Sequence, residues 1–185
     1  MVKDVLQDAE HRMAGALKAL EEDLAAIRTG RASPLLVERL PVPYYGTPTP
    51  LVQLATIAAP EPRLLTIKPF DPASLKDIER AILSSQLGLT PNNDGKLIRL
   101  SIPPLTEDRR KELIKVVHHR MEEARVAVRN VRRDSIDDLR EFKKEEMISE
   151  DEMHRGQDEL QKLTDRFVEK VDEIGQRKER EIAEV

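Results

Sequence analysis

The 185-residue sequence contains no cysteine and no tryptophan, and only 3% of its residues are aromatic. Without cysteine the chain can form no disulfide, no catalytic thiolate and no cysteine-bound zinc site. Charged residues make up 36% of the chain, against the roughly 25% that is typical of soluble domains. Few aromatic rings and many charges are typical of long, solvated helices rather than of one large globular core.

Long apolar runs are absent as well. The first residues, Met1–Asp8, contain no apolar stretch of signal-peptide length, and no segment approaches the roughly 20 apolar residues of a membrane span. We therefore expect a cytoplasmic protein that does not bind membranes.

The sequence also lacks the common signatures of enzymes. It has no Walker phosphate loop, no GxGxxG and no GxSxG, and residues 31–105 contain no histidine. His118 and Glu122 stand one helical turn apart, as a pair of metal ligands would, but an exposed polar pair on a charged helix is the more ordinary interpretation. We expect no catalytic residue, no cofactor and no metal site.

Proline is confined to the middle of the chain, where all 12 prolines lie between Pro34 and Pro104. Because proline removes a backbone donor and clashes with the preceding helical turn, the two flanks can form uninterrupted helices and the middle cannot. The sequence therefore predicts a helical domain built from residues 1–30 and 106–185, and an inserted domain at residues 31–105. The fold class is α+β.

Three amphipathic helices are predicted in the flanks, with apolar residues at steps of three and four. The first helix is expected to stop at Gly30. The second starts after the N-cap Thr106 and covers Glu107–Glu146. The third starts at Ser149, which forms a capping box with Glu152. The short connection makes the last two helices antiparallel neighbours, and the first fills their groove, so we predict an elongated three-helix bundle.

The inserted domain is predicted to be a small β/α/β unit. Its expected strands are Leu35–Leu40, Val52–Ala58, Arg63–Lys68 and Leu97–Ile102. One helix is expected between them, with Asp71 as its cap, Pro72 at its first position and Gly88 at its end. The segment Pro91–Gly95 is predicted to be a turn before the last strand.

An insert must cross to the bundle twice, and both crossings are rich in glycine or proline. The predicted hinge residues are Gly30, Arg31, Ala32, Ser33 and Pro34 in the first crossing and Pro103, Pro104, Leu105 and Thr106 in the second. Two short connections of this kind permit the domains to move relative to one another.

A local basic segment stands out in a chain whose net charge is −4. The stretch Arg120–Arg133 carries five arginines against two glutamates, a net charge of +3. Arg125, Arg129 and Arg132 are spaced by four and three and share one side of the helix, with their heads expected in water. Arginine suits a bidentate grip on phosphate.

A second basic spot lies near the first crossing, where no acidic residue occurs between Leu24 and Val37. We predict that the RNA-binding residues are Arg28, Arg31, Arg125, Arg129, Arg132 and Arg133. With so few aromatic rings, contact with the phosphates of structured RNA is favoured over base stacking. A solvated face held by intramolecular ion pairs remains the alternative.

Several motifs resemble those of the ribosome recycling factor family. They are Arg28–Pro34, Tyr44–Gly46 followed by Pro50, Leu51 and Gln53, Pro91–Gly95, Leu105–Leu113, Arg129–Ser135 and Ile148–Glu152. The commoner family form has Ile and Ala at the positions of Val131 and Ser135, and both changes leave the arginines in place. The resemblance covers essentially the whole chain in one order.

This resemblance implies an L-shaped molecule in which the bundle and the β/α/β domain are joined by a hinge. It implies binding to the post-termination ribosome, with the bundle on large-subunit ribosomal RNA; separately from the resemblance, we expect a monomer. It further implies that the factor splits the subunits together with elongation factor G and GTP. The GTP is then bound and hydrolysed by the elongation factor, not by this chain.

Two other classes of function compete with an RNA-binding translation factor. A helical adaptor protein that binds a protein partner through the bundle predicts a continuous exposed apolar stripe. A small enzyme with its site in the insert needs convergent nucleophilic, acidic or basic groups, and the insert has neither His nor Cys.

Overall fold

A computed structural model of the chain describes residues 1–184. These residues form two compact units. The first, which we call the bundle, consists of Met1–Arg28 and Glu107–Glu184, and the second, the insert, of Thr29–Thr106. Within the described range, no helix is long and apolar enough to cross a membrane.

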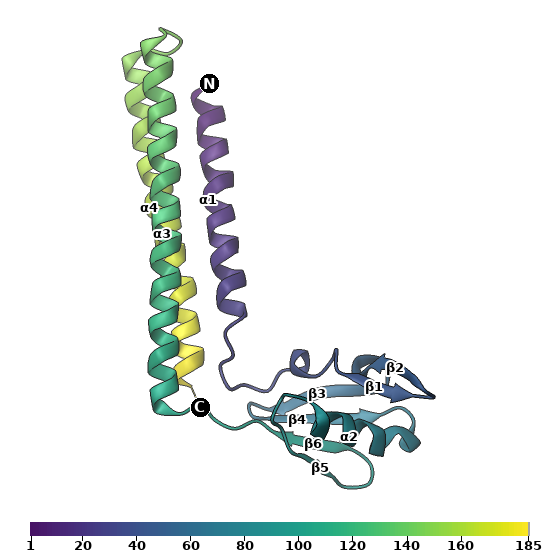
Figure 1. The fold of residues 1–185 in the computed structure, drawn as a ribbon. Coiled ribbons are helices and arrows are strands. Elements are labelled where there is room, and N and C mark those ends of the chain that lie inside the picture. The colour runs from purple at the N-terminus through teal and green to yellow at the C-terminus, as the bar shows by residue number, and fades with distance from the viewer. Residues whose placement is uncertain (185) are drawn as a thin grey trace. The chain divides into compact units, whose positions relative to one another are not determined.

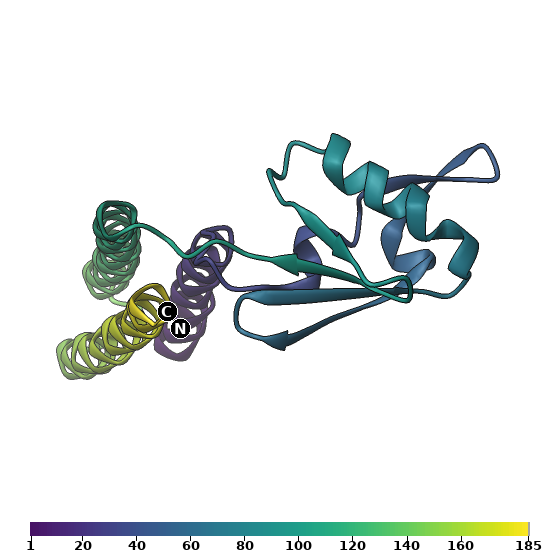
Figure 2. The same cartoon turned by 90° about the horizontal axis from the view of Figure 1, so that it is seen from below.

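The bundle contains three long helices, α1 (Val2–Ala25), α3 (Glu107–Lys144) and α4 (Glu150–Ala183). In Figure 1 the chain runs in the same direction along α1 and α4 and in the opposite direction along α3. Figure 2 looks along the helices and shows them at the corners of a triangle, so that each helix lies beside the other two. The predicted three-helix bundle is confirmed.

The buried residues of the bundle follow the predicted apolar seams. The core cluster consists of Val5, Ala9, Met13, Val128, Val131, Leu139, Ile148, Leu160 and Phe167. Apart from Ile148, which lies in the turn between α3 and α4, helical spacing places these side chains on one face of each helix, where burial of apolar area stabilises the bundle.

The ends of the helices only partly follow the sequence prediction. The expected stop of the first helix at Gly30 is wrong, because α1 ends at Ala25, one residue after its last buried side chain, Leu24. Gly30 does have the left-handed φ of +75°, but in the crossing that follows. The capping box at the start of α4 is confirmed: Ser149 Oγ accepts from the Glu152 N–H at 3.1 Å, and Glu152 Oε2 from the Ser149 N–H at 2.7 Å.

The insert contains a four-stranded antiparallel sheet and a separate two-stranded hairpin. The sheet has the order β3 (Ala55–Glu61), β4 (Leu64–Pro69), β6 (Ile98–Ser101) and β5 (Pro91–Asn93), and the hairpin consists of β1 (Pro41–Tyr44) and β2 (Thr47–Pro50). Figure 2 shows helix α2 (Leu75–Ser84) lying over one face of the sheet. Residues such as Leu65, Ile67, Ile78, Ile82, Ile98 and Leu100 fill the space between sheet and helix.

Two of the predicted strands need correction. Leu35–Leu40 is not a strand, because Ser33 Oγ accepts from the Leu35 N–H and starts a short 3-10 helix, Pro34–Leu36, followed by turns. The strand expected from Val52 begins only at Ala55, after a second 3-10 helix, Leu51–Gln53.

The hairpin strands were not predicted, because each contains two prolines. In the observed register Pro41 is opposite Pro50 and Pro43 is opposite Pro48. These are alternate positions of an antiparallel pair, whose N–H groups point away from the partner strand. Proline therefore costs this ladder no hydrogen bond.

The helix of the insert starts as predicted but ends earlier. Asp71 Oδ1 accepts from the Ala73 N–H at 3.0 Å, and Pro72 opens a 3-10 turn, Pro72–Ser74, that leads into α2. The helix ends at Ser84 rather than at Gly88, whose φ is +67°. The segment predicted as a turn at Pro91–Gly95 begins with strand β5 and turns only at its end.

Candidate nucleic-acid interface

Two of the predicted arginines of α3, Arg125 and Arg132, contact α4. Arg125 donates to Asp172 of α4 through Nη2 at 2.6 Å and Nε at 3.2 Å, and through Nη1 to Glu122 at 3.2 Å. Its side chain is only 23% exposed. The hydrogen bonds that Arg125 donates to Asp172 raise the pKa of Arg125 above its ordinary value. Arg125 therefore makes more intramolecular hydrogen bonds than the other predicted arginines of α3.

The arginines farther along α3 are held less tightly. Arg129 reaches Glu122 at 3.4 Å and is 45% exposed. Arg132 donates from Nη1 to Gln161 of α4 at 3.0 Å, while its buried Nε has no partner within residues 1–184. Arg133 is exposed and forms no ion pair with any residue of the described range. Among the predicted arginines of α3, Arg129, Arg132 and Arg133 are therefore the least engaged by other side chains.

The expectation that the heads of Arg125, Arg129 and Arg132 face water is corrected, because all three contact other side chains, and those of Arg125 and Arg132 contact α4. Their partners Asp172 and Gln161 are 47 and 29 residues away in the sequence. No short-range pattern pairs residues at those separations; only the antiparallel packing of α3 and α4 brings them together.

The contacts of α1 provide a contrast. Arg12 of α1 reaches Asp134 of α3 at 2.8 Å, and Arg166 of α4 reaches Glu10 of α1 at 2.8 Å. Each of these arginines meets a carboxylate on a different helix. Arg12 and Arg166 are thus paired across helices, whereas Arg129 pairs within α3 and Arg133 with no residue of the described range.

The remaining two predicted RNA-binding residues belong to different units. Arg28 is exposed and follows α1 at the end of the bundle's first segment. Arg31 is also exposed but belongs to the insert. Of the six residues, the bundle therefore carries five.

The histidine that was weighed as a metal ligand has another partner. His118 Nε2 lies against Glu179 Oε1 of α4 rather than against Glu122. Residues 1–184 contain no group of His, Asp or Glu side chains arranged to hold a metal ion.

Ala32 of the first predicted hinge segment and Ile102, which precedes the second, are both hydrogen-bonded to the turn between β3 and β4 of the insert. The Ala32 N–H donates to the Pro62 carbonyl at 2.7 Å, and the Ile102 N–H donates to the Arg63 carbonyl at 2.8 Å. Gly30 lies against the second crossing, since a Cβ added to it would stand 3.2 Å from Leu105 Cγ.

Residues 20–183 match the family described as ribosome recycling factor. The chain belongs to the ribosome recycling factor family. It is 58% identical to the ribosome-recycling factor of Roseiflexus sp. (strain RS-1) and 54% identical to that of Carboxydothermus hydrogenoformans, in both cases over the full length of both chains.

Two solved structures of the family resemble this chain. A solution structure of a ribosome recycling factor is 41% identical, with a TM-score of 0.69 and coverage of 100% of this chain and 98% of the other. A structure of the T. thermophilus ribosome recycling factor and the E. coli elongation factor G, bound to the E. coli post-termination complex, is 46% identical. Its TM-score is 0.60, and 98% of each chain is covered.

The family motifs occupy defined places in this ribosome recycling factor fold. Arg129–Ser135 lies within α3, and Ile148–Glu152 covers the turn and capping box that start α4. Tyr44–Gly46 forms the tip of the β1–β2 hairpin. The sequence motifs therefore mark both the basic flank and an aromatic turn that sequence reasoning did not single out as a site.

Proposed function

We propose that this chain binds the post-termination ribosome and, together with elongation factor G and GTP, splits it into subunits for recycling. Support comes from its full-length similarity to ribosome-recycling factors and from the related factor bound with elongation factor G to a post-termination complex. The sequence has no phosphate-binding loop, so the proposal assigns GTP binding and hydrolysis to the elongation factor.

The proposed contact with large-subunit ribosomal RNA is the flank of α3 that carries the predicted arginines. The observation that supports it is the position of the exposed side chains of Arg129 and Arg133 close in sequence to Arg132, whose Nε has no hydrogen-bond partner within residues 1–184. A guanidinium with free donors can take two phosphate oxygens at once. Arg28 extends the contact on the bundle and Arg31 on the insert, while Arg125 holds the flank in place through Asp172.

The proposed hinge is narrower than the sequence prediction. Ala32 and Ile102 are hydrogen-bonded to the β3–β4 turn, and Ser33 caps the 3-10 helix at Pro34. Rotation about Gly30, Arg31 and the segment Pro103–Thr106 leaves all of these bonds intact. Spin labels on the bundle and on the insert should therefore give a broad distance distribution in the free protein. A single narrow distribution would contradict the hinge.

The alternative of a helical adaptor finds little support in the bundle. The large apolar side chains exposed there within residues 1–184 are Met1, Val116, Val126 and Met147. On α3, Val116 and Val126 are ten residues apart and point about 80° away from each other, so they form no continuous stripe.

The RNA contact is tested by sedimentation of the protein with large ribosomal subunits across a salt series. Each phosphate contact adds about 0.9 to the slope of log affinity against log salt, so Arg129→Ala/Arg132→Ala should flatten that slope by about 1.8. The matched control is Arg12→Ala/Arg166→Ala, which removes the same charge from two arginines that are paired across helices elsewhere on the bundle. Wild-type binding by Arg129→Ala/Arg132→Ala at every salt concentration would refute this site.

Stability measurements separate binding from folding. Arg129→Ala/Arg132→Ala should change the free energy of unfolding by no more than about 0.5 kcal/mol, as is usual for surface positions. Arg125→Ala breaks the ion pair with Asp172 and should cost up to about 1 kcal/mol. Arg132→Lys keeps the charge but loses the planar fork, and its affinity should lie between those of wild type and Arg132→Ala.

A further inference from the structure

The tip of the β1–β2 hairpin carries an unusual pair of residues. Tyr45 and Gly46 form its two-residue turn, with φ angles of +49° and +79°. Turns with two positive φ angles favour Asn-Gly or Asp-Gly, because a large side chain is strained in this region. Tyr45 is moreover 85% exposed. A bulky ring that is both strained and solvated indicates a role outside the folding of this chain.

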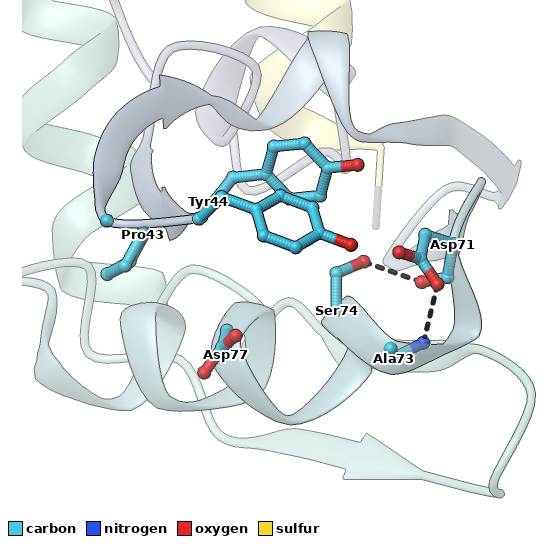
Figure 3. A pocket seen from close by; sticks show the side chains of 8 residues that line it. Pro43, Tyr44, Asp71, Ala73, Ser74 and Asp77 are labelled. Carbon is cyan, nitrogen blue, oxygen red and sulfur yellow. Dashed lines mark hydrogen bonds between the residues drawn. The ribbon is translucent and has the colours of Figure 1, made fainter.

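Tyr45 forms one wall of a cavity of about 370 Å³ between the hairpin and the start of α2. The lining also includes Tyr44, Asp71, Ser74 and Asp77. Figure 3 shows Tyr44 on one side of this space and Asp71, Ser74 and Asp77 on the other. The centroids of the two tyrosine rings lie 4.6 Å apart with an angle of 76° between the ring planes, so that the edge of one ring packs against the face of the other.

The charge of the cavity is negative. Asp71 and Asp77 are its charged lining residues, and no lysine or arginine contributes to the lining. One oxygen of Asp71 already caps the turn through Ala73, but Asp77 is exposed and has no ion-pair partner within residues 1–184. An RNA strand would bring phosphates close to two carboxylates, whereas a cation gains from both carboxylates and both rings.

We propose that this cavity, formed by Tyr44, Tyr45, Asp71 and Asp77, binds an arginine side chain presented by a partner protein. A planar guanidinium can stack on a tyrosine face while its N–H groups donate to a carboxylate beside the ring. A lysine ammonium fits less well, because it is more strongly hydrated and offers no plane for stacking. The proposal does not depend on the RNA contact of the bundle.

The composition of the chain provides a direct readout of this site. The sequence has two tyrosines and no tryptophan, and both tyrosines line the cavity. Tyrosine fluorescence of the full chain therefore reports on this cavity alone. Titration with N-acetyl-arginine amide should give a saturable change in emission. The citrulline analogue, which has the same shape without the charge, should bind about fivefold more weakly.

Three variants complete the test. Asp77→Asn should weaken binding of the arginine compound about fivefold, and Tyr45→Phe should bind like wild type because the ring is kept. Tyr45→Asn should lose affinity while the melting temperature stays the same or rises, because asparagine tolerates the positive φ.

Three results would overturn the proposal. They are the absence of a saturable change with the arginine compound, equal binding of the citrulline analogue, and unchanged affinity in Asp77→Asn. A short single-stranded RNA that alters the emission at lower concentration than the arginine compound would also overturn it, since the surface would then bind nucleic acid.

Discussion

The bundle and the insert are stabilised in different ways. In the bundle, ion pairs that join different helices flank the apolar seam, as in Arg12–Asp134 and Arg125–Asp172. In the insert, Arg99–Asp94 joins residues close in sequence, and the core between sheet and α2 is apolar. Some polar contacts of the bundle thus join separate helices, whereas Arg99–Asp94 in the insert shapes a turn.

The strongest test of this contrast separates the two units. Replacing residues 31–105 with a short Gly/Ser linker should leave a folded, strongly helical protein, because the long-range contacts of the bundle lie within its own helices. Circular dichroism and cooperative melting measure this. The same variant should lose subunit splitting entirely, as followed by light scattering of post-termination ribosomes. A coil-like spectrum would show that the bundle needs the insert.

The second prediction concerns close packing between α3 and α4. A Cβ at Gly175 would stand 2.1 Å from Met121 Sδ and 2.7 Å from its Cγ, so Gly175→Ala should destabilise the protein by about 2 kcal/mol in spite of the better helix propensity of alanine. Gly15 of α1 has nothing within 4 Å of its Cβ position. Gly15→Ala is the matched control and should stabilise by about 0.5–1 kcal/mol. Denaturant unfolding compares them, and a loss of equal size in both variants would contradict the packing.

The difference between local and long-range contacts also explains which parts of the fold could be predicted from the sequence. The bundle was predicted almost completely, because helical periodicity and the Ser149 cap are signals that lie within a few residues. The Leu35–Leu40 strand was wrong, since Ser33 and Pro34 start a 3-10 helix there, and the hairpin was missed because its prolines are harmless only in one register. That register depends on pairing across the turn, which no local pattern contains.

The candidate functional sites were likewise predictable only where local sequence patterns place their residues. The basic flank of α3 was visible in the spacing of Arg125, Arg129 and Arg132, because a single helix places them. What their heads contact was not visible, since Asp172 and Gln161 come from a helix that packs alongside. The aromatic cavity was missed for a similar reason, because it is formed by a turn and a helix start almost thirty residues apart, Tyr44 and Asp71.

The third prediction concerns the side chains that cap the start of a helix, Ser149 in the bundle and Asp71 in the insert. Ser149→Ala should cost about 1 kcal/mol, because it removes the acceptor for the Glu152 N–H at the start of α4. Asp71→Ala should cost about the same at the turn before α2. Ser149→Ala should shift the helical transition monitored at 222 nm, and Asp71→Ala the transition monitored by tyrosine fluorescence. A single variant that shifts both transitions equally would mean that the two units unfold together.

The smallest expected effect is a dependence of stability on acid pH, again with one group in each unit. The hydrogen bond from the Ser149 N–H lowers the pKa of Glu152 in the bundle, and those from the Leu97 and Lys96 N–H groups lower the pKa of Asp94 in the insert. A carboxyl group whose pKa is lower when folded stabilises the protein fully above its unfolded pKa. That stabilisation is lost as the pH falls through the lowered, folded value.

Both contributions should therefore be present at pH 6 and should disappear as the pH falls below about 4. Glu152→Gln should flatten the acid dependence of the 222 nm transition, and Asp94→Asn that of the fluorescence transition, because neither amide ionises. Melting curves of the two variants and the wild type from pH 6 to pH 3 measure these slopes. If Asp94→Asn melts with the same acid dependence as the wild type, the turn that leads into β6 draws its stability from its backbone conformation and not from the carboxylate.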